Sequence, residues 1–454
     1  MRRSAAAVVL LWLTSACGAG GPVPQSPVAA THAFAAGGIA GQYIEHVVVV
    51  VQENRSFDNL FEGFPGADTS PTGLCYNAQT RQEQTMTLQP SGWAFLPPKI
   101  DLPHSFTASV VDYDKGRMDG FCNADVLPGV TAGYLAYYYM NPSLVAPYRA
   151  MAQQYVLADR MFPTEFGGSF PQHLNLIAGN DELTPHTAVA TDPNATPWGC
   201  DAPAGSVVNV VNERRFLRPG PFPCFTQFKT IADSLDAAGV SWKYYAPSVR
   251  GSTGGALWNA FDAIKAVRYG SDWANVVSPE TSFLTDARTS LAGVTWVIPS
   301  YTNSDHPGSN SGTGPSWVAS VVNAVGRSRF WRSTAIVVLW DDWGGLYDNV
   351  PPPQLDYRGL GVRVPCIVIS PYAKTGYVSH TQYEYGSILR FIEETFGLPA
   401  LGPASAGYTD ARAASIVDGF DFTQTPRRFH RFDAPFGERF FLTQKPSATP
   451  PDTQ

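Results

Sequence analysis

The sequence predicts an α/β fold, a three-layer αβα sandwich built around a mostly parallel central sheet. Two patterns predict this class. Continuous apolar runs rich in β-branched residues recur along the chain, as is typical of strands that are covered on both faces. Helical patterns lie between them, and alternation of strands and helices is typical of a parallel sheet sandwiched by helices. Of the 454 residues, 44% are hydrophobic and 15% are charged, which supplies a large core and excludes general disorder.

The strands and helices are predicted from these patterns in chain order. The first strand is the run His46-Val47-Val48-Val49-Val50-Val51, which contains five consecutive β-branched residues. Similar apolar runs predict three more strands, at 294–298, 335–339 and 366–369. Helical patterns predict four helices, at 144–155, 231–238, 317–325 and 382–396.

Two segments, 62–130 and 180–225, interrupt this alternation because they are rich in Gly, Pro, Asn and Asp. We interpret them as long insertions over the active site and not as separate domains. The catalytic domain is predicted to span 39–425. Residues 426–454 are predicted to form a C-terminal extension whose end, 445–454, is a polar, disordered tail.

The chain begins with a predicted export signal over 1–17, which combines two arginines, an apolar run and small residues. The apolar run is shorter than the roughly 18 residues of a membrane-spanning helix. Cys17 follows Leu13-Thr14-Ser15-Ala16, which resembles a bacterial lipoprotein processing box, although Thr14 stands where Leu is usual. Export from a bacterial cell is therefore expected, with two outcomes open. Either Cys17 is lipidated and 18–38 forms a flexible tether to a membrane, or the protein is secreted or periplasmic.

The five cysteines that remain after Cys17 predict two disulfides and one free thiol. Cys366 lies in an apolar, strand-like run, where a buried free thiol is expected. The other four lie in polar, loop-like sequence and suit two disulfides in an oxidising compartment. The nearest-neighbour pairs are Cys75–Cys122 and Cys200–Cys224, but spacing alone leaves the connectivity open. No cysteine spacing indicates a zinc site.

The charge balance restricts the class of partner. Lys and Arg number 31 and Asp and Glu 38, which gives a formal net charge of −7. This balance argues against a nucleic-acid partner held by bulk charge. No oligomeric state is predicted.

Oxygen-bearing side chains follow two of the predicted strands at the point where each strand ends. The first strand runs into Glu53 and Asn54, and the 335–339 strand runs into Asp341 and Asp342. If the two strands are parallel neighbours, these side chains converge on one edge of the sheet, where open α/β sheets bind ligands. Crowded carboxylates repel one another unless they are protonated or metal-bound, so the pattern predicts a divalent metal site. The alternative is that each pair is only a polar turn after a strand.

A hydroxyl nucleophile is predicted at Ser169. The segment Gly167-Gly168-Ser169-Phe170-Pro171 leads into an apolar run, and Ser169 is placed to cap a helix there. Capping alone explains this pattern. The same position also presents a hydroxyl and free N–H groups to a phosphate, and a nearby metal would lower the pKa of the hydroxyl.

Histidines in loop-like positions supply candidates for acid–base work or phosphate contacts. His306 follows the 294–298 strand and His380 follows the 366–370 region, so both are expected at the same edge of the sheet. His104 and His173 also lie in loop-like sequence. A solvated loop residue is the ordinary alternative for each.

Five separated blocks of sequence, in order along the chain, together form a recognisable set: Gln52–Asn59, Arg117–Phe121, Ala158–Phe162, Trp340–Pro352 and Val364–Pro371. They resemble the bacterial phosphoesterase family of phospholipases C and acid phosphatases, a branch of the alkaline phosphatase superfamily. His380, followed by 387–393, resembles the closing block of that family. The resemblance extends from about residue 42 to 400.

The resemblance implies an alkaline-phosphatase-like fold and specific roles for the candidate residues. It implies one metal ion held by Glu53, Asn54, Asp341 and Asp342, with the nucleophilic hydroxyl as a further ligand. The nucleophile block of the family is Ser or Thr, one residue, Pro, a polar residue and often Arg. Here the block ends in His173, and its first position is Ser169, which therefore takes the place of the nucleophile.

The resemblance also implies that His104, His306 and His380 surround the phosphate. We therefore predict metal-dependent hydrolysis of phosphate esters through a phosphoserine, with His306 or His104 protonating the leaving oxygen. The metal is expected to be calcium, magnesium or manganese before zinc, because the predicted ligand set has no His or Cys. We favour an acid-phosphatase-like activity, with a phospholipase C acting on phosphatidylcholine-type lipids as the alternative. A lipid-anchored binding protein without catalysis is the alternative of another class.

Overall fold

The computed structural model describes residues 38–78, 80–97, 100–127, 130–249 and 258–445 of the chain. The predicted export signal, almost all of the predicted tether and the terminal tail therefore lie outside the described residues. The described residues belong to one compact unit. Among them, no helix combines the length and the apolar character needed to cross a membrane.

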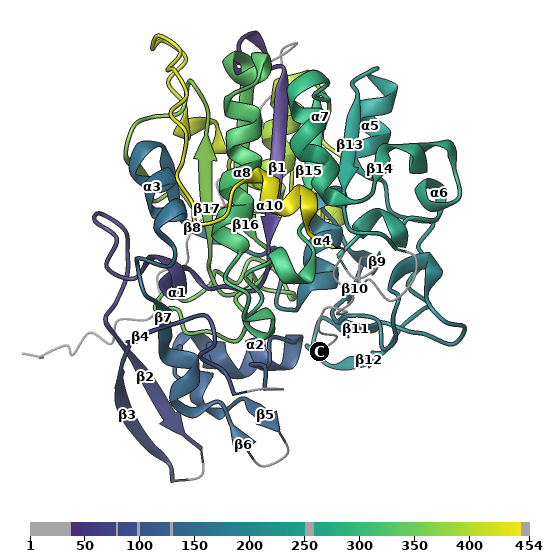
Figure 1. The fold of residues 1–454 in the computed structure, drawn as a ribbon. Coiled ribbons are helices and arrows are strands. Elements are labelled where there is room, and N and C mark those ends of the chain that lie inside the picture. The colour runs from purple at the N-terminus through teal and green to yellow at the C-terminus, as the bar shows by residue number, and fades with distance from the viewer. Residues whose placement is uncertain (1–37, 79, 98–99, 128–129, 250–257, 446–454) are drawn as a thin grey trace, which may run out of the picture. The chain divides into compact units, whose positions relative to one another are not determined.

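A nine-stranded sheet forms the centre of the described part of the fold (Figure 1). Its strands are ordered β14-β13-β15-β1-β16-β17-β8-β18, and β19 also pairs with β8. Their bounds are β1 (His46–Gln52), β8 (Val156–Phe162), β13 (Trp242–Tyr245), β14 (Val276–Val277), β15 (Val294–Val297), β16 (Thr334–Trp340), β17 (Val364–Ile369), β18 (Tyr377–Ser379) and β19 (Tyr383–Glu384). All four predicted strands are therefore confirmed.

The sheet is mixed, because one strand runs against its neighbours. β1 pairs in parallel with β15 and β16, whereas β17 is antiparallel to both β16 and β8. A parallel connection needs a crossover, usually a helix, and the segment between Trp340 and Val364 contains no helix. The carboxyl end of β17 therefore points away from the edge at which β1 and β16 end, contrary to the simple parallel arrangement.

Helices cover both faces of the sheet, as a three-layer αβα arrangement requires. On one face α3 (Ala146–Gln154) and α7 (Phe283–Thr289) pack against α8 (Gly314–Gly326). On the other, α5 (Ile231–Ala237) and α9 (Tyr385–Phe396) pack against α4 (Ser169–Ala178). All four predicted helices are confirmed. β16 is buried throughout, as expected for a strand between two helical layers.

The two predicted insertions contain secondary structure of their own. The first includes β2 (Thr72–Asn77), β3 (Gln82–Thr87), β4 (Gln89–Ser91), α2 (Phe106–Tyr113) and β5 (Asp125–Leu127). Its side chains share a second apolar cluster with Trp343, Leu346 and Tyr347 of the loop after β16. The second insertion forms an antiparallel sheet of β9 (Glu182–Thr184), β10 (Thr187–Val189), β11 (Asn209–Asn212) and β12 (Leu217–Pro219). The first insertion is thus packed against the carboxyl end of β16.

The remaining short elements connect these parts. They are α1 (Phe57–Phe61), β6 (Val130–Thr131), β7 (Tyr138–Met140), α6 (Lys265–Arg268) and α10 (Glu438–Thr443).

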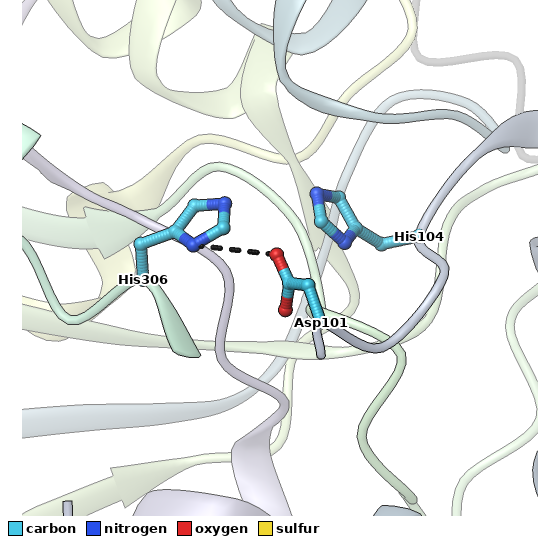
Figure 2. A group of neighbouring side chains, drawn as sticks. All are labelled: Asp101, His104 and His306. Carbon is cyan, nitrogen blue, oxygen red and sulfur yellow. Dashed lines mark ion pairs between the residues drawn. The ribbon is translucent and has the colours of Figure 1, made fainter. Parts of the chain in front are cut away.

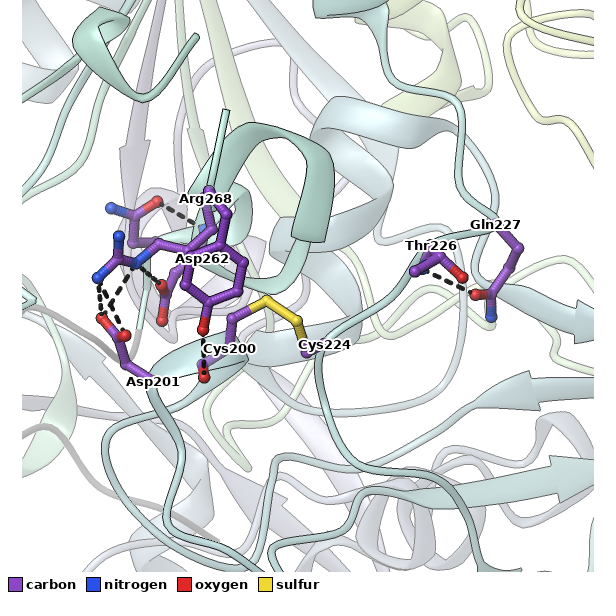
Figure 3. Close-up of a disulfide and its surroundings, with 9 residues drawn as sticks. Cys200, Asp201, Cys224, Thr226, Gln227, Asp262 and Arg268 are labelled. Atoms are coloured by element: carbon purple, nitrogen blue, oxygen red, sulfur yellow. Dashed lines mark hydrogen bonds and ion pairs between the residues drawn. A yellow bond between two sulfur atoms is a disulfide. The ribbon is translucent and has the colours of Figure 1, made fainter. Parts of the chain in front are cut away.

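Both predicted disulfides are present, and Cys366 is a buried free thiol. Cys75–Cys122 links β2 to the end of the first insertion, and Cys200–Cys224 closes a loop in the second. Beside the latter, Arg268 pairs with Asp201 and with Asp262 (Figure 3). The cross-link closes a loop within the second insertion, and the Arg268–Asp201 pair holds that loop against the segment around α6.

Removal of the Cys200–Cys224 disulfide by a double Cys→Ser substitution is expected to lower the free energy of unfolding by about 3 kcal/mol. The two cysteines are 24 residues apart, and opening such a loop releases conformational entropy of that size in the unfolded chain. Urea denaturation of the oxidised protein measures the change. Thr226→Ser, at an exposed neighbour (Figure 3), is the matched control. An unchanged unfolding midpoint in the double variant would show that the cross-link adds no stability.

Candidate active site

Glu53 and Asn54 follow β1 and are fully buried at the carboxyl edge of the sheet. Asn54 has a φ of +60°, a left-handed conformation that Asn tolerates better than most residues. Its backbone N–H donates to Asp341 Oδ1 at 2.9 Å. Its side-chain amide donates to both carboxylate oxygens of Asp342 at 3.0 Å. The backbone turn after β1 thus joins the two residues that follow β16.

Asp341 and Asp342 reach this place because β1 and β16 are parallel and in register up to Gln52 and Trp340. The turn after them is fixed by the Gly344 N–H, which donates to Asp342 Oδ1 at 2.8 Å. The sequence prediction that Glu53, Asn54, Asp341 and Asp342 lie together at one edge therefore agrees with the structure.

Ser169 is the first residue of α4, and the cap of this helix is Gly168, not Ser169 as the sequence predicted. Among the described residues, the hydrogen-bond partners of the Ser169 hydroxyl belong to the carboxylate cluster and not to the first turn of α4. It lies 3.5 Å from Glu53 Oε2, 3.4 Å from Asp342 Oδ2 and 3.4 Å from the Asn54 amide. The helix therefore directs this buried hydroxyl into the carboxylate cluster.

The first turn of α4 is tied to a residue that the sequence did not single out. The Phe170 N–H, one of the amides expected to face a phosphate, donates to Asp192 Oδ1 at 2.8 Å. Asp192 lies in the second insertion, and no local pattern marks it. This bond fixes the start of the helix and with it the position of Ser169.

His173 lies one helical turn after Ser169 and faces the same cluster. Its Nε2 is 3.0 Å from Glu53 Oε1 and 3.7 Å from Asp341 Oδ2. Burial lowers the pKa of His173 to about 4. The imidazole is therefore neutral near pH 7, and it places a nitrogen beside two of the predicted metal ligands.

The electrostatics of the cluster favour a bound cation. Burial, followed by the nearby Asp341 and Asp342 charges, raises the pKa of Glu53 well above its usual value. Burial and Asp341 raise the pKa of Asp342 in the same way. Among the described residues, no hydrogen-bond donor reaches the buried acceptors Asn54 Oδ1 and Asp341 Oδ2. Three buried carboxylates and two acceptors without donors fit a divalent metal ion.

His104 and His306 face one another at the same edge, with Asp101 between them (Figure 2). The centroids of the two imidazole rings are 5.5 Å apart. His306 Nδ1 is 3.6 Å from Asp101 Oδ2, and His104 Nδ1 is 2.8 Å from the Leu102 carbonyl oxygen. The charge of His104 acts to lower the pKa of Asp342, so Asp101, His104 and His306 lie close enough to the carboxylate cluster to interact with it. The sequence prediction missed Asp101, which no local motif distinguishes.

The end of β1 also positions the loop that carries His306. The Gln52 side chain accepts a hydrogen bond from the Asp305 N–H at 2.9 Å and donates to the Asn303 carbonyl. The Asp305 carboxylate accepts from Tyr148 and from Trp340. His306 is thus held by contacts to β1 and β16 and not by its own loop alone.

His380 lies at the same edge of the sheet, but farther along it. β17 is antiparallel and ends at the opposite edge, whereas β18 is parallel to β8 and therefore to β16, so His380 reaches the predicted edge from a different strand. His380 instead follows β18, three strands from β16, a lateral distance of about 14 Å. It is 59% exposed and its Nδ1 is 2.8 Å from Asp159.

The tight turn after Asp342 makes Gly344 essential to the site. Its φ is +62°, and an added Cβ would lie 2.2 Å from the Asn54 carbonyl oxygen. Gly344→Ala is therefore expected to displace Asn54, lower activity at least about tenfold and destabilise the fold by about 2 kcal/mol.

The matched control is Gly63→Ala, at a φ of +66° with no atom within 4 Å of the added Cβ. This variant isolates the cost of the left-handed backbone. Activity and thermal unfolding of the two variants give the comparison. Equal losses in both would mean that contact with Asn54 is not the cause.

A model of the Phosphoesterase family matches residues 44–399. The chain belongs to the phosphoesterase family. The match covers the sheet, the candidate site and both insertions. It confirms the resemblance inferred from the sequence, and it makes the chain a phosphoric ester hydrolase.

Named relatives of this phosphoesterase are phospholipases C. It is 25% identical over 456 residues to phospholipase C B of Mycobacterium tuberculosis, covering 87% of this chain and 81% of the relative. It is 26% identical over 432 residues to a non-hemolytic phospholipase C of Pseudomonas aeruginosa, covering 84% of this chain and 57% of that protein.

Solved structures with a similar arrangement include an alkaline phosphatase superfamily protein from Vibrio parahaemolyticus. That protein is 11% identical, with a TM-score of 0.40, covering 87% of this chain and 76% of that one. A phosphonate monoester hydrolase from Silicibacter pomeroyi is 12% identical with a TM-score of 0.27, covering 63% and 73%.

Proposed function

We propose that this phosphoesterase hydrolyses its substrate through Ser169, beside a divalent metal ion. The observation that carries the proposal is the position of the Ser169 hydroxyl, which is 3% exposed and within 3.5 Å of Glu53, Asn54 and Asp342. A serine that served only as part of a helix start would have no need of three buried ionic or amide partners. The same partners are those predicted from the sequence to bind metal.

Glu53, Asn54, Asp341, Asp342 and Ser169 would hold the metal. When bound, it supplies positive charge that lowers the pKa of a coordinated hydroxyl and stabilises charge developing on a phosphoryl oxygen. From the sequence, zinc ranks last because the predicted ligand set has no His or Cys. The structure places the His173 nitrogen near Glu53 and Asp341, so the site offers one imidazole beside its oxygen ligands and zinc is no longer disfavoured. Calcium, the ion least suited to a nitrogen ligand, becomes the weakest candidate.

In the first step, Ser169 Oγ attacks phosphorus in line with the leaving group. Its proton passes to Glu53 or Asp342, whose carboxylate oxygens are 3.5 and 3.4 Å away. The new bond joins Oγ to phosphorus, and the bond from phosphorus to the ester oxygen breaks. Water then attacks the phosphoserine, releases the phosphate product and restores the serine hydroxyl.

His306 is the better placed of the two histidines to protonate the leaving oxygen. The Gly308 N–H donates to His306 Nδ1, so the neutral ring carries its proton on Nε2. In His104, Nδ1 faces the Leu102 carbonyl oxygen and holds the proton there. His306 can therefore donate from Nε2, while the His104 ring is held by the Leu102 carbonyl oxygen beside Asp342. We propose no role in the reaction for His380, given its distance from the cluster.

The names of the relatives favour a second candidate for the substrate. Sequence reasoning preferred an acid-phosphatase-like activity on monoesters, whereas the relatives reported above are phospholipases C. Hydrolysis of a phospholipid-type diester uses the same serine, with the diacylglycerol oxygen as leaving group. Membership of the phosphoesterase family argues against the alternative of a non-catalytic binding protein.

Two chromogenic substrates separate these possibilities. Turnover of p-nitrophenyl phosphate, with little of p-nitrophenylphosphorylcholine, is expected for a phosphatase, and the reverse for a phospholipase C. Both activities should disappear after dialysis against a chelator, and return with manganese or zinc more completely than with calcium. Turnover that survives complete removal of metal, verified by metal analysis, would contradict the proposal.

A further inference from the structure

A cleft lined by arginines lies away from the candidate active site. Its volume is about 720 Å³, and five of its ten lining residues are Arg327, Arg332, Arg427, Arg428 and Arg431. No acidic residue lines it. This concentration of positive charge occurs in a chain whose formal net charge is −7. We call this feature the arginine groove.

The arginine groove is held rigidly by one of its own arginines. Arg427 donates to the carbonyl oxygens of Gln154 and Ala373, and its guanidinium lies 4.3 Å from the centre of the Tyr155 ring. The Arg427 carbonyl oxygen accepts from the Trp331 indole at 2.9 Å. The backbone that carries Arg428 and Arg431 is therefore fixed to the body of the protein.

Close packing forms the apolar floor of the groove. The Phe429 and Trp331 rings are 5.1 Å apart. Phe429 also packs directly on Gly326, at the end of α8, where an added Cβ would lie 2.4 Å from the ring. The exposed arginines thus border a preformed hollow, which distinguishes them from scattered surface charges.

The four other arginines are exposed, and none takes part in an ion pair among the described residues. Elsewhere in the described chain, arginines such as Arg358 and Arg363 are buried and paired with carboxylates. Glu438, an acidic residue close to the groove, is paired with Arg288. The groove therefore presents guanidinium groups that no carboxylate of the described residues pairs with directly.

The groove lies at the edge of the sheet opposite the candidate active site. Arg332 lies two residues before β16, and the Ser333 carbonyl oxygen accepts from the Glu45 N–H just before β1. The catalytic candidates follow the other ends of these strands, about 23 Å away for a strand of seven residues. In Figure 1, β1 runs from this edge toward α4 and α2. The groove is thus separate from the substrate site.

The described chain also begins at this edge. The Gly38 N–H donates to the carbonyl oxygen of Glu394, near the end of α9, and 39–42 lead directly into β1. The 37 preceding residues contain Cys17, the candidate site of lipidation. A membrane to which the chain is attached through Cys17 would be within reach of the groove.

We propose that the arginine groove binds the phosphate groups of anionic lipids and holds this edge of the protein against a membrane surface. Guanidinium groups bind phosphate oxygens in pairs of hydrogen bonds, and clustered arginines are attracted to anionic headgroups. The candidate active site then faces away from that surface. The proposal does not depend on Ser169 or on the metal.

Vesicle co-sedimentation of the full chain tests the proposal. A Cys17→Ser background removes the predicted lipid anchor, so that binding reports on the folded protein. We expect binding to phosphatidylglycerol-containing vesicles, none to pure phosphatidylcholine, and release at high ionic strength. Arg428→Gln with Arg431→Gln is expected to weaken binding about thirtyfold, with an unchanged thermal unfolding midpoint.

The matched control is Arg81→Gln with Arg214→Gln, which removes two exposed arginines away from the groove. It should bind vesicles as tightly as the parent. Equal weakening in both double variants would show that bulk charge is responsible and would overturn the proposal. So would equal binding to phosphatidylcholine. Displacement from vesicles by millimolar inorganic phosphate, at constant ionic strength, would assign the groove to soluble phosphate instead and would also overturn it.

Discussion

Ser169→Ala is expected to abolish turnover, with a loss in kcat of about 10⁴-fold or more, the scale seen when a catalytic nucleophile is removed. The fold should persist, because Gly168 and not Ser169 stands at the cap of α4, and the Asp192 bond to the Phe170 N–H holds the first turn of that helix. Steady-state kinetics with the better chromogenic substrate measures the loss. The thermal unfolding midpoint should change by only a few degrees.

Ser290→Ala is the matched control for this substitution, since it makes the same chemical change at an exposed position after α7. It should retain full activity. A Ser169→Ala enzyme that kept its kcat within tenfold of the parent would remove Ser169 as the nucleophile. The site would then need another nucleophile, such as water held in the carboxylate cluster.

Glu53→Gln is expected to lower metal affinity and to reduce kcat at least about a hundredfold, since the metal supplies several kcal/mol of charge stabilisation. In the absence of metal, the same substitution should increase the free energy of unfolding. Burial and the Asp341 and Asp342 charges raise the pKa of Glu53, so its ionised form destabilises the metal-free fold. The variant should therefore be more stable than the parent at neutral pH, by about 1–3 kcal/mol.

The pH dependence follows from the direction of this pKa shift. A carboxyl with a raised pKa takes up a proton in the folded state, so its cost grows as pH rises above the ordinary value of about 4.5. The stability gain of Glu53→Gln should accordingly vanish toward pH 4 and increase toward neutrality. Denaturation at several pH values in the presence of chelator measures it.

Glu165→Gln provides the matched control. Burial followed by repulsion from Asp181 raises the pKa of Glu165, and its carboxylate is fully buried, but it lies outside the metal cluster. It should show the stability gain without the loss of metal affinity. If Glu53→Gln bound metal as tightly as the parent by calorimetry, Glu53 would not be a ligand.

Much of the fold could be predicted because buried strands and amphipathic helices leave plain patterns. The run at 46–51 and the run at 335–339 each appear as buried strands, and their parallel pairing brings Glu53 beside Asp341. The direction of β17 could not be predicted in this way. A strand buried on both faces has the same apolar composition whichever way it runs. Only the absence of a crossover helix before such a strand indicates that it is antiparallel.

The parts of the site that sequence reasoning missed depend on contacts between distant segments. Asp101 meets His306 across about 200 residues, and Asp192 reaches the start of α4 from the second insertion. Neither acid lies in a motif. His173 was predicted to be near a phosphate, but the turn of α4 directs it toward Glu53. Helix geometry specifies that direction only once the start of the helix is known.

The central claim, that Ser169 carries the phosphoryl group, is tested most directly by trapping the intermediate. The metal-loaded enzyme is mixed with p-nitrophenyl phosphate, quenched in acid and digested, and its peptides are analysed by mass spectrometry. We predict a phosphate adduct on Ser169, absent without substrate and absent in Ser169→Ala. Full turnover with no adduct at Ser169, at any quench time and under conditions that preserve a phosphoserine standard, would contradict the account.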